Sequence, residues 1–222
     1  MVGNWGESAD RPSPAEVLVV GHSFVRRAFQ HAHSHREACA PLTHDAIVGI
    51  GMGGATLVQI LDKAMEALSF HRAVRLIIIH GGENEIDQDR PGSPPVDYDQ
   101  VYQAIQDSIN ALLGKLPHGC KVIFLDPANR FRWTTSEGKQ GEGYDYYMER
   151  LSKLISIFHS VRNAHPDIVL KAKRLRDISN IKSFGPDGVH LNEAGIHYYC
   201  HHLIQHIRRL VTSVNFSLPA GH

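Results

Sequence analysis

Short runs of apolar, mostly β-branched residues alternate along this chain with longer segments whose apolar residues recur at helical spacing. Each run has the length of a strand, and only the second contains a glycine, Gly49. This alternation is typical of βαβ units built around a parallel sheet. The pattern therefore predicts an α/β fold with five parallel strands, at Val17–Val20, Ala46–Ile50, Leu76–Ile79, Val122–Leu125 and Ile168–Leu170.

The segments between these runs place their apolar residues on one helical face. Ala55–Leu68 and Val101–Leu113 predict amphipathic helices that cross from one strand to the next. A third helix, Tyr146–Ala164, is predicted to end before Pro166, because proline disfavours helical backbone in the residue that precedes it. A last helix is predicted to follow Asn192, since asparagine caps helix N-termini well.

Two segments interrupt the alternation. Gln88–Asp97 contains three prolines and Arg130–Gly143 contains three glycines, so both are predicted to be long surface loops. Loops of this length beside strand ends often form the walls of a site. We expect one domain at residues 15–214, preceded by a disordered segment at 1–14 and followed by a tail at 215–222.

Composition and charge narrow the class of protein. A chain of 222 residues with 42% hydrophobic composition can bury one substantial core. Basic and acidic residues number 23 each, so no net charge attracts nucleic acid or an anionic membrane. The three cysteines are scattered, which favours buried thiols in a reducing compartment. Without a signal peptide or a run of membrane-spanning length, we expect a soluble cytoplasmic protein, and nothing indicates its oligomeric state.

Four polar or glycine-rich patches stand at the ends of predicted strands. Gly21-His22-Ser23 follows the first strand, Gly51–Thr56 the second and Gly81–Glu85 the third, while Asp187–His190 comes after the fifth. In an open parallel sheet, ligands bind outside the carboxyl ends of the strands. We therefore expect these four patches to meet at one edge of the sheet.

The residue types in these patches suit acyl transfer. Ser23 is the candidate nucleophile, His190 the base that takes its proton, and Asp187 the acid that orients the imidazole. The backbone N–H groups of Ser23 and Gly54 and the side-chain amide of Asn84 are candidate donors to an oxyanion. The predicted chemistry needs no cofactor and no metal ion.

Each patch also has a plain structural interpretation. Ser23 would serve only as a helix cap, Gly51–Gly54 as a flexible connection, and Asn84 as a cap or turn residue. Asp187 and His190 would belong to a type I turn before the last helix. What favours a site is the coincidence of all four patches, in the order and at the strand ends that one site requires.

Two other kinds of site are disfavoured by spacing. The glycine cluster Gly51–Gly54 has neither the ending of a P-loop nor the G-x-G-x-x-G spacing of a dinucleotide fold. Ser23 is followed by Phe24-Val25, which does not fit the Gly-x-Ser-x-Gly elbow of the α/β-hydrolases. Nucleotide binding and that hydrolase fold are therefore set aside.

Histidines gather in two places on the predicted helices. His197 and His201 would share one helix face and form a candidate zinc pair. Neither group has acidic or cysteine residues at an established ligand spacing, apart from Cys200, so solvated helix faces are the better interpretation. The two groups are His31, His33 and His35 near the first helix, and His197, His201 and His206 in the last.

The four patches together resemble the sequence blocks of the SGNH (GDSL-type) hydrolase superfamily, over roughly Ala15–Val214. This resemblance implies a flavodoxin-like three-layer α/β/α sandwich with five parallel strands in the order 2-1-3-4-5. It also implies the roles of the site residues. Ser23 would be the nucleophile, Gly54 and Asn84 oxyanion donors, and Asp187 with His190 would complete the triad. The form Gly-His-Ser-Phe-Val-Arg-Arg is similar to a poorly characterised animal branch, which implies no substrate.

Two residues depart from the pattern of that family. His22 stands where the family usually has Asp, and Glu85 stands where an Asp usually follows the asparagine. His22 would alter the hydrogen bonding beside Ser23 and add a competing base. The longer side chain of Glu85 would change the turn that the Asp closes.

We predict a serine esterase or acyl hydrolase that acts on a small-molecule or acylated ester. The first alternative is a catalytically weakened or inactive binding module that keeps the fold and the pocket. A structural or interaction domain is the second alternative, and the presence of Ser23 and of Asp187 with His190 argues against it.

Overall fold

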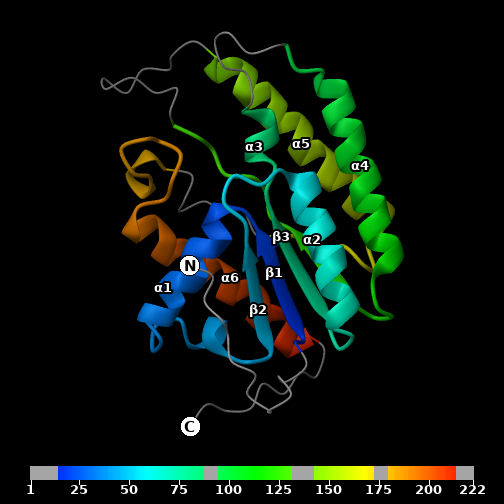
Figure 1. Ribbon diagram of the computed structural model, residues 1–222, viewed down its shortest axis with the longest axis vertical. Helices are drawn as coiled ribbons and strands as arrows, with labels where there is room; N and C mark the ends of the chain where they lie inside the picture. The colour runs from blue at the N-terminus through cyan, green and yellow to red at the C-terminus, as the bar shows by residue number, and fades with distance from the viewer. Residues whose placement is uncertain (1–14, 88–94, 132–142, 173–179, 214–222) are drawn as a thin grey trace, which may run out of the picture.

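A parallel sheet lies at the centre of the computed structural model, which describes residues 15–87, 95–131, 143–172 and 180–213 (Figure 1). In this part of the chain the sheet has four strands in the order β2-β1-β3-β4. The parallel α/β architecture predicted from the apolar runs is confirmed. The strands are β1 Val17–Gly21, β2 Ile47–Gly51, β3 Leu76–His80 and β4 Lys121–Phe124.

The prediction of a fifth strand at Ile168–Leu170, and with it the order 2-1-3-4-5, is wrong. This segment forms one isolated parallel bridge, between Val169 and Val122 of β4. Two backbone hydrogen bonds flank it, from Val122 N to Ile168 O at 3.0 Å and from Leu170 N to Val122 O at 2.8 Å. Only three apolar residues stand between Asp167 and Lys171, so the segment is too short to extend the ladder.

Helices cover both faces of the sheet and make three layers (Figure 1). One face carries α2 Leu57–Phe70, α4 Tyr98–Lys115 and α5 Tyr144–Ala164, and the other carries α1 Ser23–Ser34 and α6 Glu193–Ser213. The predicted helices are present with ends shifted by a few residues. The short elements are α3 Glu83–Ile86 and two 3-10 helices, η1 Ala40–Thr43 and η2 Ile181–Ser183.

The alternation of side chains in β1 explains why its apolar run is unbroken. Leu18 and Val20 join the core under α2, α4 and α5, whereas Val17 and Val19 join the core under α1 and α6. A central strand of a doubly covered parallel sheet buries both of its faces, so every position is apolar. The same alternation holds for Leu76–Ile79 of β3, a strand that is buried throughout and ends at the polar His80.

Several expectations fall outside the described residues. Segments 1–14 and 215–222 lie there, as does most of both predicted loops, with residues 88–94 and 132–142. Within the described residues, no helix combines the length and the apolar character that crossing a membrane requires. The three cysteines, Cys39, Cys120 and Cys200, are buried free thiols, as predicted.

Candidate active site

The turn between β1 and α1 places Ser23 at the first position of the helix. His22 is the N-cap of α1, because its Nδ1 accepts a hydrogen bond from Phe24 N at 3.3 Å. The interpretation of Ser23 as a mere cap is therefore wrong. Gly21 is needed at the strand end, because a Cβ there would lie 2.5 Å from the carbonyl oxygen of His80.

The second patch forms the turn from β2 into α2. Gly51 packs directly on α1, since a Cβ at this position would lie 2.2 Å from Arg26 N. Gly54 has a φ of +73°, a left-handed conformation that favours glycine, and a Cβ there would meet no atom within 4 Å. Thr56 and Gln59 form a capping box that begins α2. The backbone around Gly54 is therefore fixed on both sides and open to solvent in between.

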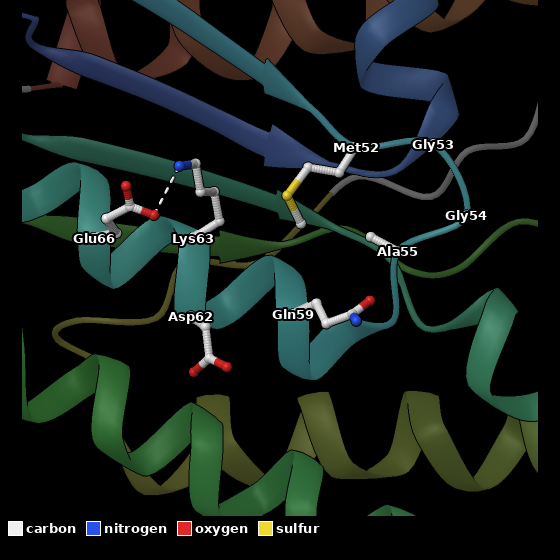
Figure 2. Close-up of a pocket in the computed structure, with 8 residues that line it drawn as sticks. All are labelled: Met52, Gly53, Gly54, Ala55, Gln59, Asp62, Lys63 and Glu66. Carbon is white, nitrogen blue, oxygen red and sulfur yellow. Dashed lines mark hydrogen bonds and ion pairs between the residues drawn. The ribbon is translucent and has the colours of Figure 1, made fainter.

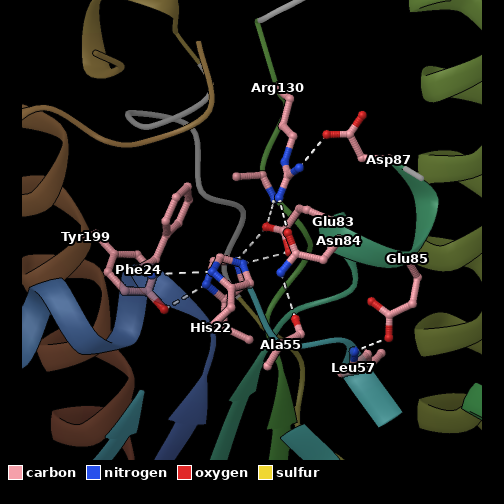
Figure 3. Close-up of polar contacts among 12 residues, drawn as sticks. His22, Phe24, Ala55, Leu57, Glu83, Asn84, Glu85, Asp87, Arg130 and Tyr199 are labelled. Atoms are coloured by element: carbon pink, nitrogen blue, oxygen red, sulfur yellow. Dashed lines mark hydrogen bonds and ion pairs between the residues drawn. The ribbon is translucent and has the colours of Figure 1, made fainter. Parts of the chain in front are cut away.

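Asn84 in the third patch holds the second patch by its side chain. Its Nδ2 donates to Ala55 O at 2.7 Å, and its Oδ1 accepts from Arg130 at 2.5 Å (Figure 3). Arg130 also forms an ion pair with Asp87. A carbonyl on one side and a guanidinium on the other fix the orientation of the amide. The second N–H of the amide has no acceptor among the residues that the structure describes.

Asp187 and His190 are in direct contact. His190 Nδ1 lies 2.6 Å from Asp187 Oδ2, and Asp187 Oδ1 accepts hydrogen bonds from Val189 N and His190 N at 3.0 and 2.9 Å. Burial opposes ionisation of the Asp187 carboxyl, but these hydrogen bonds outweigh it and hold its pKa below the usual range. Asp187 thus orients the ring with Nδ1–H toward itself and Nε2 outward. Asp187 also closes a turn before α6, as expected if Asp187 and His190 had a structural role alone.

The segment that carries His190 is attached to the helix that carries Ser23. Arg27, one turn along α1 from Ser23, donates to Leu191 O at 3.1 Å. Residues four apart share a helix face, so Ser23 lies on the side of α1 that faces this segment. Within the described part of the chain, neither Ser23 Oγ nor His190 Nε2 has a hydrogen-bond partner. A hydrogen bond between Ser23 Oγ and His190 Nε2 is therefore not formed in this structure. Hydrogen bonds between catalytic side chains often tighten only around substrate.

A buried polar network behind Ser23 was missed by the sequence analysis. His22 Nε2 lies 2.8 Å from Glu83 Oε2 (Figure 3). Ala128 N donates to Glu83 Oε1 at 2.8 Å. His80 Nε2 lies 3.3 Å from Glu83 Oε1, while His80 Nδ1 contacts the Tyr199 hydroxyl at 2.8 Å. The expectation that His22 acts as a competing base is wrong, because both of its nitrogens are engaged. The available signal was Glu83 itself, an acid that closely follows the apolar run Leu76–Ile79.

Glu83 is ionised in this network. Burial would raise the pKa of its carboxyl, but the two imidazoles of His22 and His80 hold the pKa well below its usual range. Burial lowers the pKa of His80, and the nearby Glu83 only partly opposes this effect. The result is a buried carboxylate beside a neutral His80.

Glu85 reaches the N-terminus of α2 and does not close a turn of its own. Its Oε1 accepts a hydrogen bond from Leu57 N (Figure 3). Oε1 also accepts one from Val58 N at 3.2 Å. Its Oε2 is buried without a hydrogen-bond partner among the described residues. Burial raises the pKa of Glu85 to about 7, because it outweighs the hydrogen bonds from the backbone of Glu85, Leu57 and Val58.

Comparison with known proteins identifies the fold. No protein-family model and no curated protein matches the sequence. A GDSL-like lipase from Bacteroides thetaiotaomicron is 17% identical, with a TM-score of 0.59 over 87% of this chain and 88% of the lipase. A catalytic variant of an acetylxylan esterase from Geobacillus stearothermophilus is 14% identical, with a TM-score of 0.59 over 89% and 95% of the two chains. The chain has the fold of these esterases and lipases. These similarities do not support placement in the animal branch that carries Gly-His-Ser-Phe.

A surface pocket of about 490 Å³ adjoins the second patch. Figure 2 shows that the Gly53–Ala55 turn forms one end of the pocket and that polar side chains of α2 lie along it. Lys63 and Glu66 form an exposed ion pair there, with Nζ and Oε2 2.7 Å apart. The lining residues are Met52, Gly53, Gly54, Ala55, Gln59, Asp62, Lys63 and Glu66.

The surface histidines pack on one another across α1 and α6. The rings of His31 and His35 stack with centroids 4.0 Å apart, and His31 meets His197 edge to face at 5.9 Å. His197 lies against His201 in turn, as their helical spacing predicts. Among the described residues, however, the three potential ligands whose donor atoms converge are the buried His22, His80 and Glu83.

Proposed function

We propose that this protein is a serine esterase or acyl hydrolase of the SGNH type. Ser23 is the nucleophile, His190 the general base and Asp187 the orienting acid. The observation that carries this proposal is the 2.6 Å contact between His190 Nδ1 and Asp187 Oδ2, on a segment that Arg27 attaches to the helix of Ser23. The fold shared with esterases and lipases supports it.

The reaction begins when Ser23 Oγ attacks the ester carbonyl carbon and His190 Nε2 takes the hydroxyl proton. The tetrahedral intermediate collapses, the carbon–oxygen bond to the alcohol breaks, and His190 returns the proton to the departing alcohol. Water then attacks the acyl-enzyme with His190 again as base, which releases the acid and restores Ser23. Asp187 stabilises the imidazolium that forms in both steps.

Three donors stabilise the oxyanion in this proposal. The N–H of Ser23 lies at the N-terminus of α1, where the helix dipole favours negative charge. Gly54 has an open backbone, so a substrate oxygen can approach its N–H closely. Asn84 contributes the amide hydrogen that Ala55 does not use. Each preorganised donor of this kind is typically worth about 3 kcal/mol in the transition state.

The substrate is a small-molecule or acylated ester. The pocket beside Gly54 suits a polar group of that substrate, since Gln59, Asp62 and the Lys63–Glu66 pair form its wall. The similar structures include acetylxylan esterases and a GDSL-like lipase, so both polar and apolar esters are represented among proteins of this fold.

A second candidate function is a binding module that keeps the pocket without turnover. The observation that favours it is the missing bond between Ser23 Oγ and His190 Nε2 among the described residues. In that case the network of His22 and Glu83 would only maintain the fold.

Labelling with a fluorophosphonate probe distinguishes the two functions, because the probe reacts only with an activated serine. We expect the wild-type protein to be labelled and to hydrolyse p-nitrophenyl acetate, and Ser23→Ala and His190→Ala to lose both activities. Ser152→Ala, at an exposed serine of α5, is the matched control and should label like the wild type. Absence of labelling and of turnover in the wild-type protein would exclude the hydrolase and leave the binding module.

A further inference from the structure

The protons of the network behind Ser23 can be assigned from its contacts. Phe24 N–H points at His22 Nδ1, so this nitrogen carries a lone pair and the ring proton is on Nε2. His22 Nε2–H then donates to Glu83 Oε2 over 2.8 Å. His22 is thus held in a single tautomer by a backbone donor on one side and a carboxylate on the other.

His80 is oriented in the same way. If its Nδ1–H donated to Tyr199, the lone pair of Nε2 would face the ionised Glu83 Oε1 at 3.3 Å in a fully buried place. Two lone pairs in contact without water are unfavourable. The Tyr199 hydroxyl therefore donates to His80 Nδ1, and the ring proton of His80 is on Nε2, which lies 3.3 Å from Glu83 Oε1 without a hydrogen bond to it. Both histidines thus carry their ring proton on Nε2, the nitrogen nearest the Glu83 carboxylate, and of these two described N–H groups only that of His22 forms a hydrogen bond with it.

These tautomers do not suit a metal ion, although two histidines and a glutamate are common zinc ligands. The three donor atoms lie within 4.8 Å of one another. A ligating histidine normally binds the metal through one nitrogen and donates the N–H of the other. His22 would have to bind through Nε2 while Nδ1 accepts from Phe24 N, which leaves no place for its ring proton. The cluster is a hydrogen-bond network and not a metal site.

The network connects the elements that carry the proposed catalytic groups. His22 precedes Ser23 and caps its helix, and Glu83 precedes Asn84. Glu83 also binds Ala128 N, in the segment after β4, and so fixes its own position against a third strand end. A single carboxylate thereby sets the distance between the nucleophile turn and an oxyanion donor. His22, Glu83 and His80 expose 2% or less of their surface, so water does not compete.

From this geometry we infer that Glu83 is a positioning residue of the active site, which acts through the tautomer of His22 on the Ser23 turn. With Glu83 ionised, His22 keeps its proton on Nε2 and its Nδ1 free to cap α1. Without that carboxylate, the ring can carry its proton on Nδ1, which would repel Phe24 N–H and release the first turn of α1. The effect of Glu83 on catalysis rests on the proposed function. The tautomers of His22 and His80 do not.

The tautomers are tested by NMR on protein labelled with ¹⁵N-histidine, with no need for activity. We expect His22 and His80 in the wild-type protein to carry their protons on Nε2. In Glu83→Gln, the ring nitrogens of His22 and the amides of Ser23 and Phe24 should shift. A Glu83→Gln spectrum that matches the wild type at these nuclei overturns the inference, as does coordination of added Zn²⁺ by His22 Nε2.

The effect of Glu83 on catalysis is tested with p-nitrophenyl acetate and the fluorophosphonate probe. We expect Glu83→Gln to lower kcat by about 10- to 100-fold with little change in KM, because displacement of a nucleophile affects the reaction more than binding. Glu149→Gln, at an exposed glutamate of α5, is the control. If Glu83→Gln does not fold, His22→Asn breaks the same contact and keeps an N-cap. Wild-type kcat in either folded variant overturns the inference.

Placing a carboxylate at position 22 distinguishes a positioning role of Glu83 from a general effect on protein stability. His22→Asp retains an N-cap but sets a second carboxylate against Glu83, so it should lose activity. Adding Glu83→Gln to His22→Asp removes the repulsion and should restore most of that activity. A double variant no better than His22→Asp alone contradicts the coupling. If wild-type protein shows no Ser23 chemistry, the proposed function fails, and the NMR experiment still decides the inference.

Discussion

The side-chain amide of Asn84 donates a hydrogen bond to the carbonyl oxygen of Ala55 over 2.7 Å. This contact joins α3, which follows β3, to the turn after β2 and holds the open backbone of Gly54 beside the amide. Two of the three proposed oxyanion donors therefore depend on one side chain.

Replacing Asn84 with Ala should reduce activity strongly. The change removes one oxyanion donor and releases the turn of Gly54, so we expect kcat for p-nitrophenyl acetate to fall by about 10²- to 10³-fold. Gln103→Ala, which removes an exposed amide of α4, should leave kcat unchanged. An Asn84→Ala variant with wild-type kcat would remove Asn84 from the oxyanion site.

Asp187→Asn tests whether Asp187 orients His190. The amide keeps the acceptor for Val189 N and His190 N, so the turn should persist. Its NH₂ group would replace the acceptor for His190 Nδ1–H and favour the wrong tautomer, with an expected fall in kcat of about 10⁴-fold. Circular dichroism and thermal unfolding should remain close to those of the wild type, as in the control Asp145→Asn on α5. Retained activity would show that Asp187 serves the turn alone.

Glu85 should make stability depend on pH. Because its pKa rises from 4.5 to about 7 on folding, the folded state binds more protons between these values. Protonated Glu85 therefore stabilises the folded state by on the order of 3 kcal/mol in the free energy of unfolding. This stabilisation is fully present below pH 4.5 and is lost as the pH rises through about 7. Urea unfolding of the wild type and of Glu85→Gln from pH 5 to 8 measures the difference. Parallel pH profiles for the two proteins would show that Glu85 does not titrate in this range.

Two glycines in helices should respond oppositely to alanine. A Cβ at Gly195 would lie 2.1 Å from the carbonyl oxygen of Ser183, so Gly195→Ala should push α6 away from η2 and destabilise the protein by about 1–3 kcal/mol. A Cβ at Gly114 in α4 would meet no atom within 4 Å, so Gly114→Ala should stabilise by about 0.5 kcal/mol. Thermal unfolding measures both. Equal effects of the two substitutions would contradict this account of the packing.

The local pattern was enough to place most elements. Strands β1 to β4 and helices α2, α4, α5 and α6 are where the apolar periodicity placed them, because a doubly covered parallel sheet requires unbroken apolar strands and amphipathic helices. The error at Ile168–Leu170 has the same origin. The apolar composition of Ile168–Leu170 is compatible with a strand. The number of residue pairs that this segment forms with β4 depends on how the two pack in the folded chain, and among the described residues only the pair of Val169 and Val122 forms.

By itself, the sequence determined the parallel α/β architecture, the strand-end position of Ser23, Gly54 and Asn84, and the spacing that lets Asp187 reach His190. The tertiary structure alone decided the partners of the charged side chains. Glu83 and His22 are 61 residues apart, and Glu85 and Leu57 are 28 apart, so no local pattern could pair them. Burial then fixed their protonation, because a charge without water needs partners that only the folded chain brings together.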